Sequence, residues 1–184
     1  MKLHIMKGEE KIRQLLTAYD SICALDMAPV RQAIQSSLEI KLDYISDDEF
    51  DFGRRNMLNY GHCIGHALES VSNFRIPHGQ AVVMGMILAN HIAQRRGILS
   101  EAKRRFIETR LLVPSLNVRA QPADLDPTAI IDAMSKDKKR TGSGLALVMP
   151  TEAGEMVRVD DAQAHEVRVV LKEVADSLCG GSRF

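Results

Sequence analysis

The chain has 184 residues, with 24 Lys and Arg against 24 Asp and Glu, and 45% of its residues are hydrophobic. This length fits one domain that buries a core of its own. The zero formal charge excludes the strongly basic surface of a protein that binds nucleic acid or an anionic membrane.

The cysteines and the apolar runs indicate the compartment. Cys23, Cys63 and Cys179 are odd in number and far apart, which is typical of a reducing compartment and not of a disulfide-stapled secreted domain. No apolar run approaches the roughly 20 residues that a membrane span needs. The apolar stretch at the N-terminus is too short for a signal peptide. We therefore expect a cytoplasmic protein with no membrane partner and no nucleic acid partner.

The first half of the chain reads as helical. Ala, Leu, Met, Glu, Lys, Arg and Gln dominate the composition and favour helices. Apolar residues at helical spacing predict a helix over 9–25, and Pro29 predicts the start of a second helix that extends to Leu42. Further helices are predicted over 58–70 and 81–96.

The second half adds the only predicted strands. Its expected elements are a helix from the candidate N-cap Ser100 to about Leu112, a helix opened by Asp126-Pro127, a small β-hairpin near residues 145–159, and a last helix from Asp161. The predicted class is therefore mostly α. We expect one helical domain over 1–179 and a flexible tail over 180–184.

One predicted helix carries an unusual set of polar side chains. His62 and His66 stand at i and i+4, so they share one helix face about 6 Å apart. Asn59 and Arg55 precede them on that face by one and two turns. His78 could approach the same point from a loop. Such a face is unsuited to a core and suited to a metal ion and an anionic, polyhydroxylated substrate.

Several of these features also have simpler interpretations. Cys63 stands where the two-histidine zinc helix of metalloproteases has Glu, so that class is disfavoured. We expect Cys63 to be a small packing residue, and Met84 and Met86 to lie in the core. Three histidines without sequence partners are expected to be surface or hydrogen-bonded residues: His4, His91 and His165.

Two motifs follow in order: Arg55-x-x-Leu58-Asn59-x-Gly61-His62-x-x-Gly65-His66-Ala67-x-Glu69 and His78-Gly79-x-Ala81-Val82-x-x-Gly85-Met86. This pattern resembles the signature of the 3-dehydroquinate synthases, which belong to the sugar phosphate cyclases and are related to the iron-containing alcohol dehydrogenases. Lys41 and the later Asp137-Lys138-Lys139 extend the resemblance over nearly the whole chain.

The resemblance implies roles for individual residues. His62 and His78 would be ligands of a divalent metal ion, Zn or Co. His66 would be a catalytic residue that binds substrate and organises proton transfer, and Lys41 would act with it. The residues implied to contact the carboxylate, hydroxyls or phosphate of the substrate are Arg55, Asn59, Lys41, Lys138, Lys139 and Lys2.

The implied activity is that of a lyase of the shikimate pathway type, in aromatic amino acid biosynthesis. The family reaction oxidises a ring hydroxyl with bound NAD, eliminates phosphate, reduces the ketone again and closes a carbocycle by aldol addition. The expected substrate is a small phosphorylated sugar acid. A metal ion suits this chemistry because it orients hydroxyls and stabilises developing oxyanions.

Three departures from the family pattern shape the expectation. The family binds NAD in an N-terminal domain, and Thr141-Gly-Ser-Gly144 is not a dinucleotide fingerprint. The family's third metal ligand is a glutamate three residues before a lysine that matches Lys2. Gln80 replaces the usual Glu after His-Gly. We therefore expect only the C-terminal metal- and substrate-binding domain, inactive alone, with the NAD-binding domain as the absent partner.

Other interpretations stay open. The chain could belong to another sugar phosphate cyclase, with sedoheptulose 7-phosphate or glucose 6-phosphate as substrate. It could be a relative of the metal-dependent alcohol dehydrogenases, whose simpler chemistry would not need the Arg, Asn and Lys donors. It could also be a non-enzymatic helical binding module. The face left by an absent domain would be apolar, so a homodimer is possible.

Overall fold

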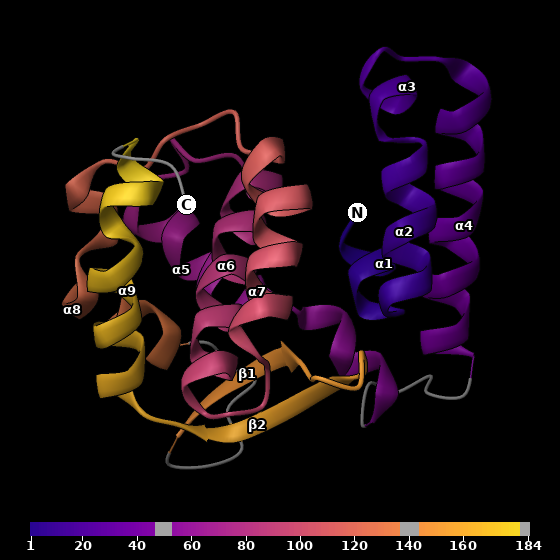
Figure 1. Ribbon diagram of the computed structural model, residues 1–184. Helices are drawn as coiled ribbons and strands as arrows, with labels where there is room; N and C mark the ends of the chain where they lie inside the picture. The colour runs from indigo at the N-terminus through magenta and orange to yellow at the C-terminus, as the bar shows by residue number, and fades with distance from the viewer. Residues whose placement is uncertain (47–52, 137–143, 181–184) are drawn as a thin grey trace.

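The computed structural model describes residues 1–46, 53–136 and 144–180, and it confirms the predicted, mostly α class. A group of N-terminal helices stands beside a larger helical body, and a two-stranded antiparallel sheet lies under that body (Figure 1). Within the described ranges, no helix combines the length and the apolar character needed to cross a membrane.

The N-terminal group consists of α1 (Lys2–Met6), α2 (Glu9–Thr17), α3 (Tyr19–Cys23) and α4 (Met27–Ile45). The predicted single helix over 9–25 is wrong, because the backbone turns at Ala18 (φ −99°, ψ 1°) and divides it into α2 and α3. The second predicted helix is confirmed, but it begins at Met27 and not at Pro29. Its N-cap is Asp26, whose carboxylate accepts a hydrogen bond from the Ala28 N–H.

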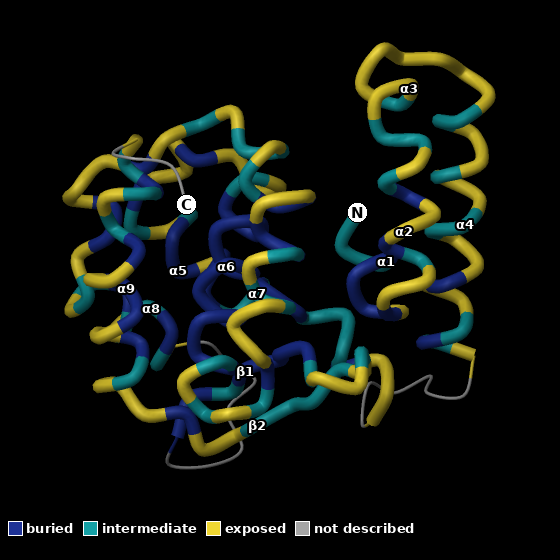
Figure 2. The backbone as a smooth tube through the Cα atoms, in the orientation of Figure 1, coloured by how far each residue is buried: buried dark blue, intermediate teal, exposed yellow. Residues whose placement is uncertain are grey.

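The body is arranged around α6, which is buried without interruption over 81–93 (Figure 2). Met84 and Met86 lie in this core, as predicted. The helical elements of the body are η1 (Arg54–Asn59), α5 (His62–Val71), α6 (His78–Arg95), α7 (Glu101–Ile107), η2 (Glu108–Leu112), η3 (Val113–Ser115), η4 (Pro122–Leu125), α8 (Pro127–Ser135) and α9 (Ala164–Cys179).

Two predicted helix starts in the body are confirmed by their caps. The Ser100 hydroxyl accepts a hydrogen bond from the Lys103 N–H, and the Asp126 carboxylate caps α8. The helix predicted to run to about Leu112 is α-helical only as far as Ile107 and continues as a π-helical turn. In that turn Glu108 is buried and its carboxylate pairs with the Arg104 guanidinium.

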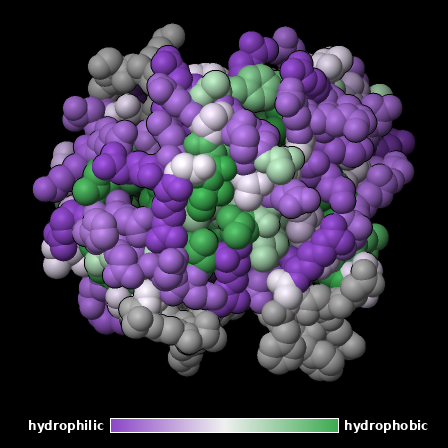
Figure 3. All heavy atoms as spheres, turned by 60° about the horizontal axis from the view of Figure 1, so that its bottom comes forward, coloured by the Kyte–Doolittle hydropathy of each residue, from purple (hydrophilic) through white to green (hydrophobic). Residues whose placement is uncertain are grey.

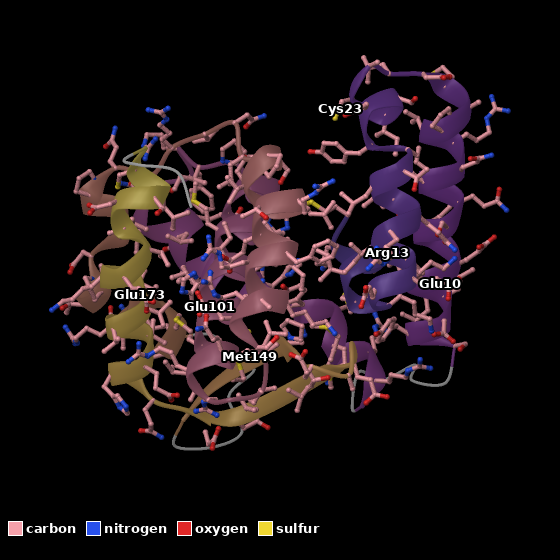
Figure 4. All side chains as sticks on the ribbon, in the orientation of Figure 1. Glu10, Arg13, Cys23, Glu101, Met149 and Glu173 are labelled. Carbon is pink, nitrogen blue, oxygen red and sulfur yellow. The ribbon has the colours of Figure 1, made fainter. Side chains whose placement is uncertain are left out.

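The predicted β-hairpin near 145–159 is confirmed as β1 (Leu145–Pro150) paired with β2 (Met156–Ala162). Because β2 continues to Ala162, the last helix begins at Ala164 and not at Asp161. Met149 of β1 is fully buried between the sheet and the helices (Figure 4). The face seen from below is mostly hydrophilic, with a narrow apolar strip at its centre (Figure 3).

Glycines bring α5 and α6 unusually close together. A Cβ atom built on Gly85 would lie 2.1 Å from the carbonyl oxygen of Gly61, and one built on Gly65 would lie 3.1 Å from the carbonyl oxygen of Ala81. Gly61 also has φ +77°, a left-handed conformation that favours glycine. We call Gly61, Gly65 and Gly85 the glycine contact. It sets the distance between the two helices that carry the histidines.

We predict that Gly85→Ala destabilises the protein by about 3 kcal/mol, because the new methyl group meets backbone that cannot move aside as a side chain would. Gly79→Ala is the matched control in the same helix, since its Cβ would meet nothing within 4 Å. Urea unfolding of both variants measures the difference. Equal stability of the two variants would contradict the close approach of α5 and α6.

Two of the three histidines without sequence partners are buried. His91 is hydrogen-bonded to Arg104 (2.9 Å) and His165 is exposed, as expected. His4 differs from the expectation, because it is 3% exposed and its Nδ1 has no hydrogen-bond partner. Burial lowers the pKa of His4 from 6.5 to about 4. His4 is therefore buried in its neutral form at pH 7.

This burial predicts a loss of stability in mild acid. The unfolded chain binds a proton at His4 below pH 6.5 and the folded chain does so only near pH 4, so the stability present above pH 6.5 falls across that window. One pKa unit corresponds to about 1.4 kcal/mol, so the loss can reach about 3 kcal/mol. Urea unfolding at several pH values should show a shallower decline for His4→Gln. An unchanged decline would show that His4 does not titrate in this way.

Candidate metal and substrate site

Three histidines meet between α5 and α6. His62, His66 and His78 each offer a ring nitrogen, and these three atoms lie within 4.8 Å of one another. The ring centroids are 5.4 Å apart for His62–His66 and His62–His78, and 5.7 Å apart for His66–His78. We call these residues the histidine cluster. His62 is half-buried, and the other two are exposed.

The local backbone explains how the cluster forms. Gly61, in its left-handed conformation, ends the preceding turn and makes His62 the first residue of α5, with His66 one turn later. Pro77 is the N-cap of α6, so His78 is the first residue of that helix. The prediction that His78 approaches from a loop is therefore wrong. A helix start holds the residue more firmly than a loop would.

The predicted single helix over 58–70 is also wrong. Arg55 and Asn59 lie in η1, a 3-10 helix, and the turn at Tyr60 and Gly61 separates them from α5. They therefore do not continue the helix face of the histidines. Asn59 Nδ2 donates to Asn56 Oδ1 at 3.4 Å, while Arg55 is exposed.

The environment of His62 keeps its imidazole neutral. Its Nδ1 lies 3.2 Å from the Tyr60 carbonyl oxygen and 3.5 Å from the Lys2 ammonium. Burial, and then the charge of Lys2, lowers the pKa of His62 to about 4. When Nδ1–H donates to the Tyr60 carbonyl, Nε2 keeps its lone pair. A neutral imidazole with one free nitrogen is the form that binds a metal ion.

His78 has a comparable arrangement with a side-chain acceptor. Its Nδ1 lies 2.9 Å from Glu69 Oε2, and the Glu69 side chain is 14% exposed. Glu69 is part of the first sequence motif, but no role was predicted for it. The available signal was its spacing, because Glu69 follows His62 by two helical turns and so lies on the same face of α5.

One lysine from the N-terminal helices, Lys2, lies beside the cluster, with its ammonium 3.5 Å from His62 Nδ1. The Lys2 ammonium donates to the Leu58 carbonyl at 2.6 Å. Burial, and then the charge of Lys41, lowers the pKa of Lys2 to about 8. Lys2 therefore contributes positive charge beside His62, and Lys41 adds to the positive charge around Lys2. Lys138 and Lys139 lie outside the described residues.

The donor set fits a divalent metal ion. Imidazole nitrogens bind Zn²⁺ at about 2.0–2.1 Å, so two of them on one ion are at most about 4 Å apart. The cluster nitrogens, within 4.8 Å of one another, need only small ring movements to reach that spacing. Imidazole suits Zn²⁺ and several other transition metals, so the residues do not select one ion.

Gln80 bridges two elements through its side-chain amide. Its Nε2 donates to the Ser115 carbonyl at 3.1 Å, and its Oε1 accepts from the Asn117 N–H at 2.9 Å. The amide is thus engaged in holding the first turn of α6 against the segment 115–117. A carboxylate could accept the second bond but not donate the first. The departure from the family's Glu at this position is accounted for by packing.

Comparison with known proteins identifies the family. The family profile described as "3-dehydroquinate synthase C-terminal" matches residues 1–140. The curated 3-dehydroquinate synthase of Symbiobacterium thermophilum is 32% identical over 168 residues, which are 91% of this chain and 47% of the relative. That of Desulforamulus reducens is 35% identical over 157 residues, 84% of this chain and 43% of the relative. The chain thus spans about half the length of these relatives.

Solved structures show the same fold. The 2-epi-5-epi-valiolone synthase ValA of Streptomyces hygroscopicus, with NAD+ and Zn2+ bound, superposes with a TM-score of 0.76 at 20% identity over 95% of this chain and 49% of that one. A 2-deoxy-scyllo-inosose synthase complexed with carbaglucose-6-phosphate, NAD+ and Co2+ gives 0.64 at 22% identity over 79% and 42%. The chain belongs to the 3-dehydroquinate synthase C-terminal family, within the fold of the sugar phosphate cyclases.

Proposed function

We propose that this chain is the metal- and substrate-binding part of a 3-dehydroquinate synthase, a carbocycle-forming phosphate lyase of the shikimate pathway. The observation that supports this most directly is the convergence of three histidines from two helices, next to Lys2. The curated relatives favour 3-dehydroquinate synthase over other cyclases. Because the Gln80 amide is engaged in hydrogen bonds to the segment 115–117, its departure from the family's Glu does not by itself favour sedoheptulose 7-phosphate or glucose 6-phosphate as substrate.

In this proposal His62 and His78 hold a divalent ion, Zn²⁺ or Co²⁺. When bound, the ion supplies a Lewis acid that orients hydroxyl groups and stabilises negative charge on oxygen. The hydrogen bonds at the two Nδ1 atoms orient both rings. His66 stands beside the pair with an exposed ring, so it can reach the substrate and hold or move a proton there.

The cationic residues bind the anionic groups of a small phosphorylated sugar acid. Lys2 contributes positive charge beside His62 and Lys41 adds to the charge around Lys2, and charge-assisted hydrogen bonds to carboxylate or phosphate are stronger than neutral ones. Lys138 and Lys139 are proposed to join them, and Arg55 and Asn59 to contact carboxylate and hydroxyl groups. The cytoplasmic location, the homodimer and the absence of a nucleic acid partner stay predictions.

We predict that the chain binds Zn²⁺ or Co²⁺ with micromolar affinity or better and that the double variant His62→Ala, His78→Ala loses this binding, because each substitution removes one imidazole donor. Isothermal titration calorimetry measures it. His165→Ala is the control, since His165 is an exposed histidine outside the cluster. Retained binding in the double variant would refute the metal site. An absence of binding in the unsubstituted chain would overturn the proposal that these histidines suffice to hold the ion.

We also predict that a polypeptide of these 184 residues has no NAD-dependent lyase activity by itself. The family reaction needs a bound dinucleotide, and the sequence holds no Gly-x-Gly-x-x-Gly fingerprint. The assay follows phosphate release from the phosphorylated sugar acid with NAD and Zn²⁺ present. Turnover above the protein-free rate would overturn the proposal that a separate domain supplies the cofactor site.

A further inference from the structure

The pair of Glu69 and His78 joins the end of α5 to the start of α6. The carboxylate of Glu69 lies 2.9 Å from His78 Nδ1. The acceptor is largely buried, with 14% of its side chain exposed, while the His78 side chain is 56% exposed. The carboxylate is therefore largely shielded from solvent, while the ring that it contacts is exposed.

This contact selects the form of the imidazole. A neutral imidazole carries one N–H, and the hydrogen bond made by one nitrogen decides which nitrogen is left with the lone pair. Because a carboxylate only accepts, Nδ1 must be the donor, and Nε2 keeps its lone pair. The partner carboxylate also raises the basicity of the ring as a ligand.

The main-chain hydrogen bonds of Glu69 do not involve its side-chain carboxylate. Its carbonyl oxygen accepts from Ser72 Oγ at 3.1 Å and from the Phe74 N–H at 2.8 Å, and these bonds shape the turn after α5. Substitution of the side chain therefore leaves this turn in place. At His62 the corresponding acceptor is the Tyr60 carbonyl, a main-chain group that substitution cannot remove.

We propose that Glu69 is the positioning residue of the metal site, fixing the Nδ1–H tautomer and the ring orientation of His78. The proposal rests on the proposed function, since it assumes that His78 is a ligand. Glu69 itself does not bind the ion in this arrangement. It acts through His78, which ties metal affinity to a residue outside the ligand set.

The test compares two variants with a matched control. Glu69→Ala removes the acceptor, and Glu69→Gln keeps an amide oxygen that can accept Nδ1–H but removes the charge. Glu173→Gln is the control, because Glu173 on α9 is a carboxylate near another histidine, 3.6 Å from His91 Nδ1, away from the cluster. Zn²⁺ affinity is measured by calorimetry, and the tautomer by NMR of ¹⁵N-histidine-labelled, metal-free protein.

We expect Glu69→Ala to weaken Zn²⁺ binding about 10- to 100-fold, Glu69→Gln to weaken it less, and Glu173→Gln to leave it unchanged. The His78 signals should show the Nδ1–H tautomer in the unsubstituted chain and in Glu69→Gln, and lose it in Glu69→Ala. A purely structural role for Glu69 would not move the tautomer.

The outcomes separate the two proposals. Undiminished Zn²⁺ affinity or an unchanged tautomer in Glu69→Ala, together with loss of binding in the His62, His78 double variant, overturns the role of Glu69 and leaves the metal site standing. Retained binding in the double variant, or no Zn²⁺ binding in the unsubstituted chain, overturns both.

Discussion

The site depends on how closely α5 approaches α6. Three positions without a Cβ allow the backbones to touch, and at the tightest point a methyl group on Gly85 would overlap the Gly61 carbonyl. Two helices packed through larger side chains lie about 8–10 Å apart. The closer approach that the glycines allow brings the first turns of both helices together, and the ring nitrogens of His62, His66 and His78 lie within 4.8 Å of one another. The glycine contact is therefore part of the site.

The residues of α5 that pack against the rest of the protein and those that form the site lie on different faces of the helix. Gly61 and Gly65 face α6, while Ile64 and Leu68 are buried in the core. His62, His66 and Glu69 occupy the remaining face. Packing thus fixes the rotation of the helix before any ligand binds, and it fixes the direction of the three polar side chains with it. Preorganisation of this kind lowers the cost of binding a metal ion and a substrate.

The sequence predicted this fold well where the signal was local. Asp126-Pro127 and Ser100 correctly predicted the starts of their helices, and the 145–159 hairpin was predicted from two short apolar runs on either side of a Pro- and Gly-containing turn. The two predicted helices that were divided share one cause, which is that backbone breaks without Pro are hard to recognise in a sequence. Ala18 divides a helix whose apolar spacing continues across it, and Gly61 separates Asn59 from His62 although the i, i+3 spacing suggests one helix. Neither break changes the hydrophobic periodicity.

The histidine cluster was foreseen through spacing and family resemblance, whereas the role of Glu69 was not. Spacing relates residues within one helix, but the contact from Glu69 to His78 crosses from α5 to α6 and depends on how the two helices pack. The contact from Glu69 to His78 also affects the balance of charge at the cluster. The cluster places the neutral imidazole of His62 beside the positive charge of Lys2, which favours an anion and opposes a divalent cation. The largely buried carboxylate of Glu69 lies on the other ring, His78, and offsets part of that repulsion. If the site holds a cation and an anion side by side, as proposed, a negative charge behind the ligand is needed to balance the lysine.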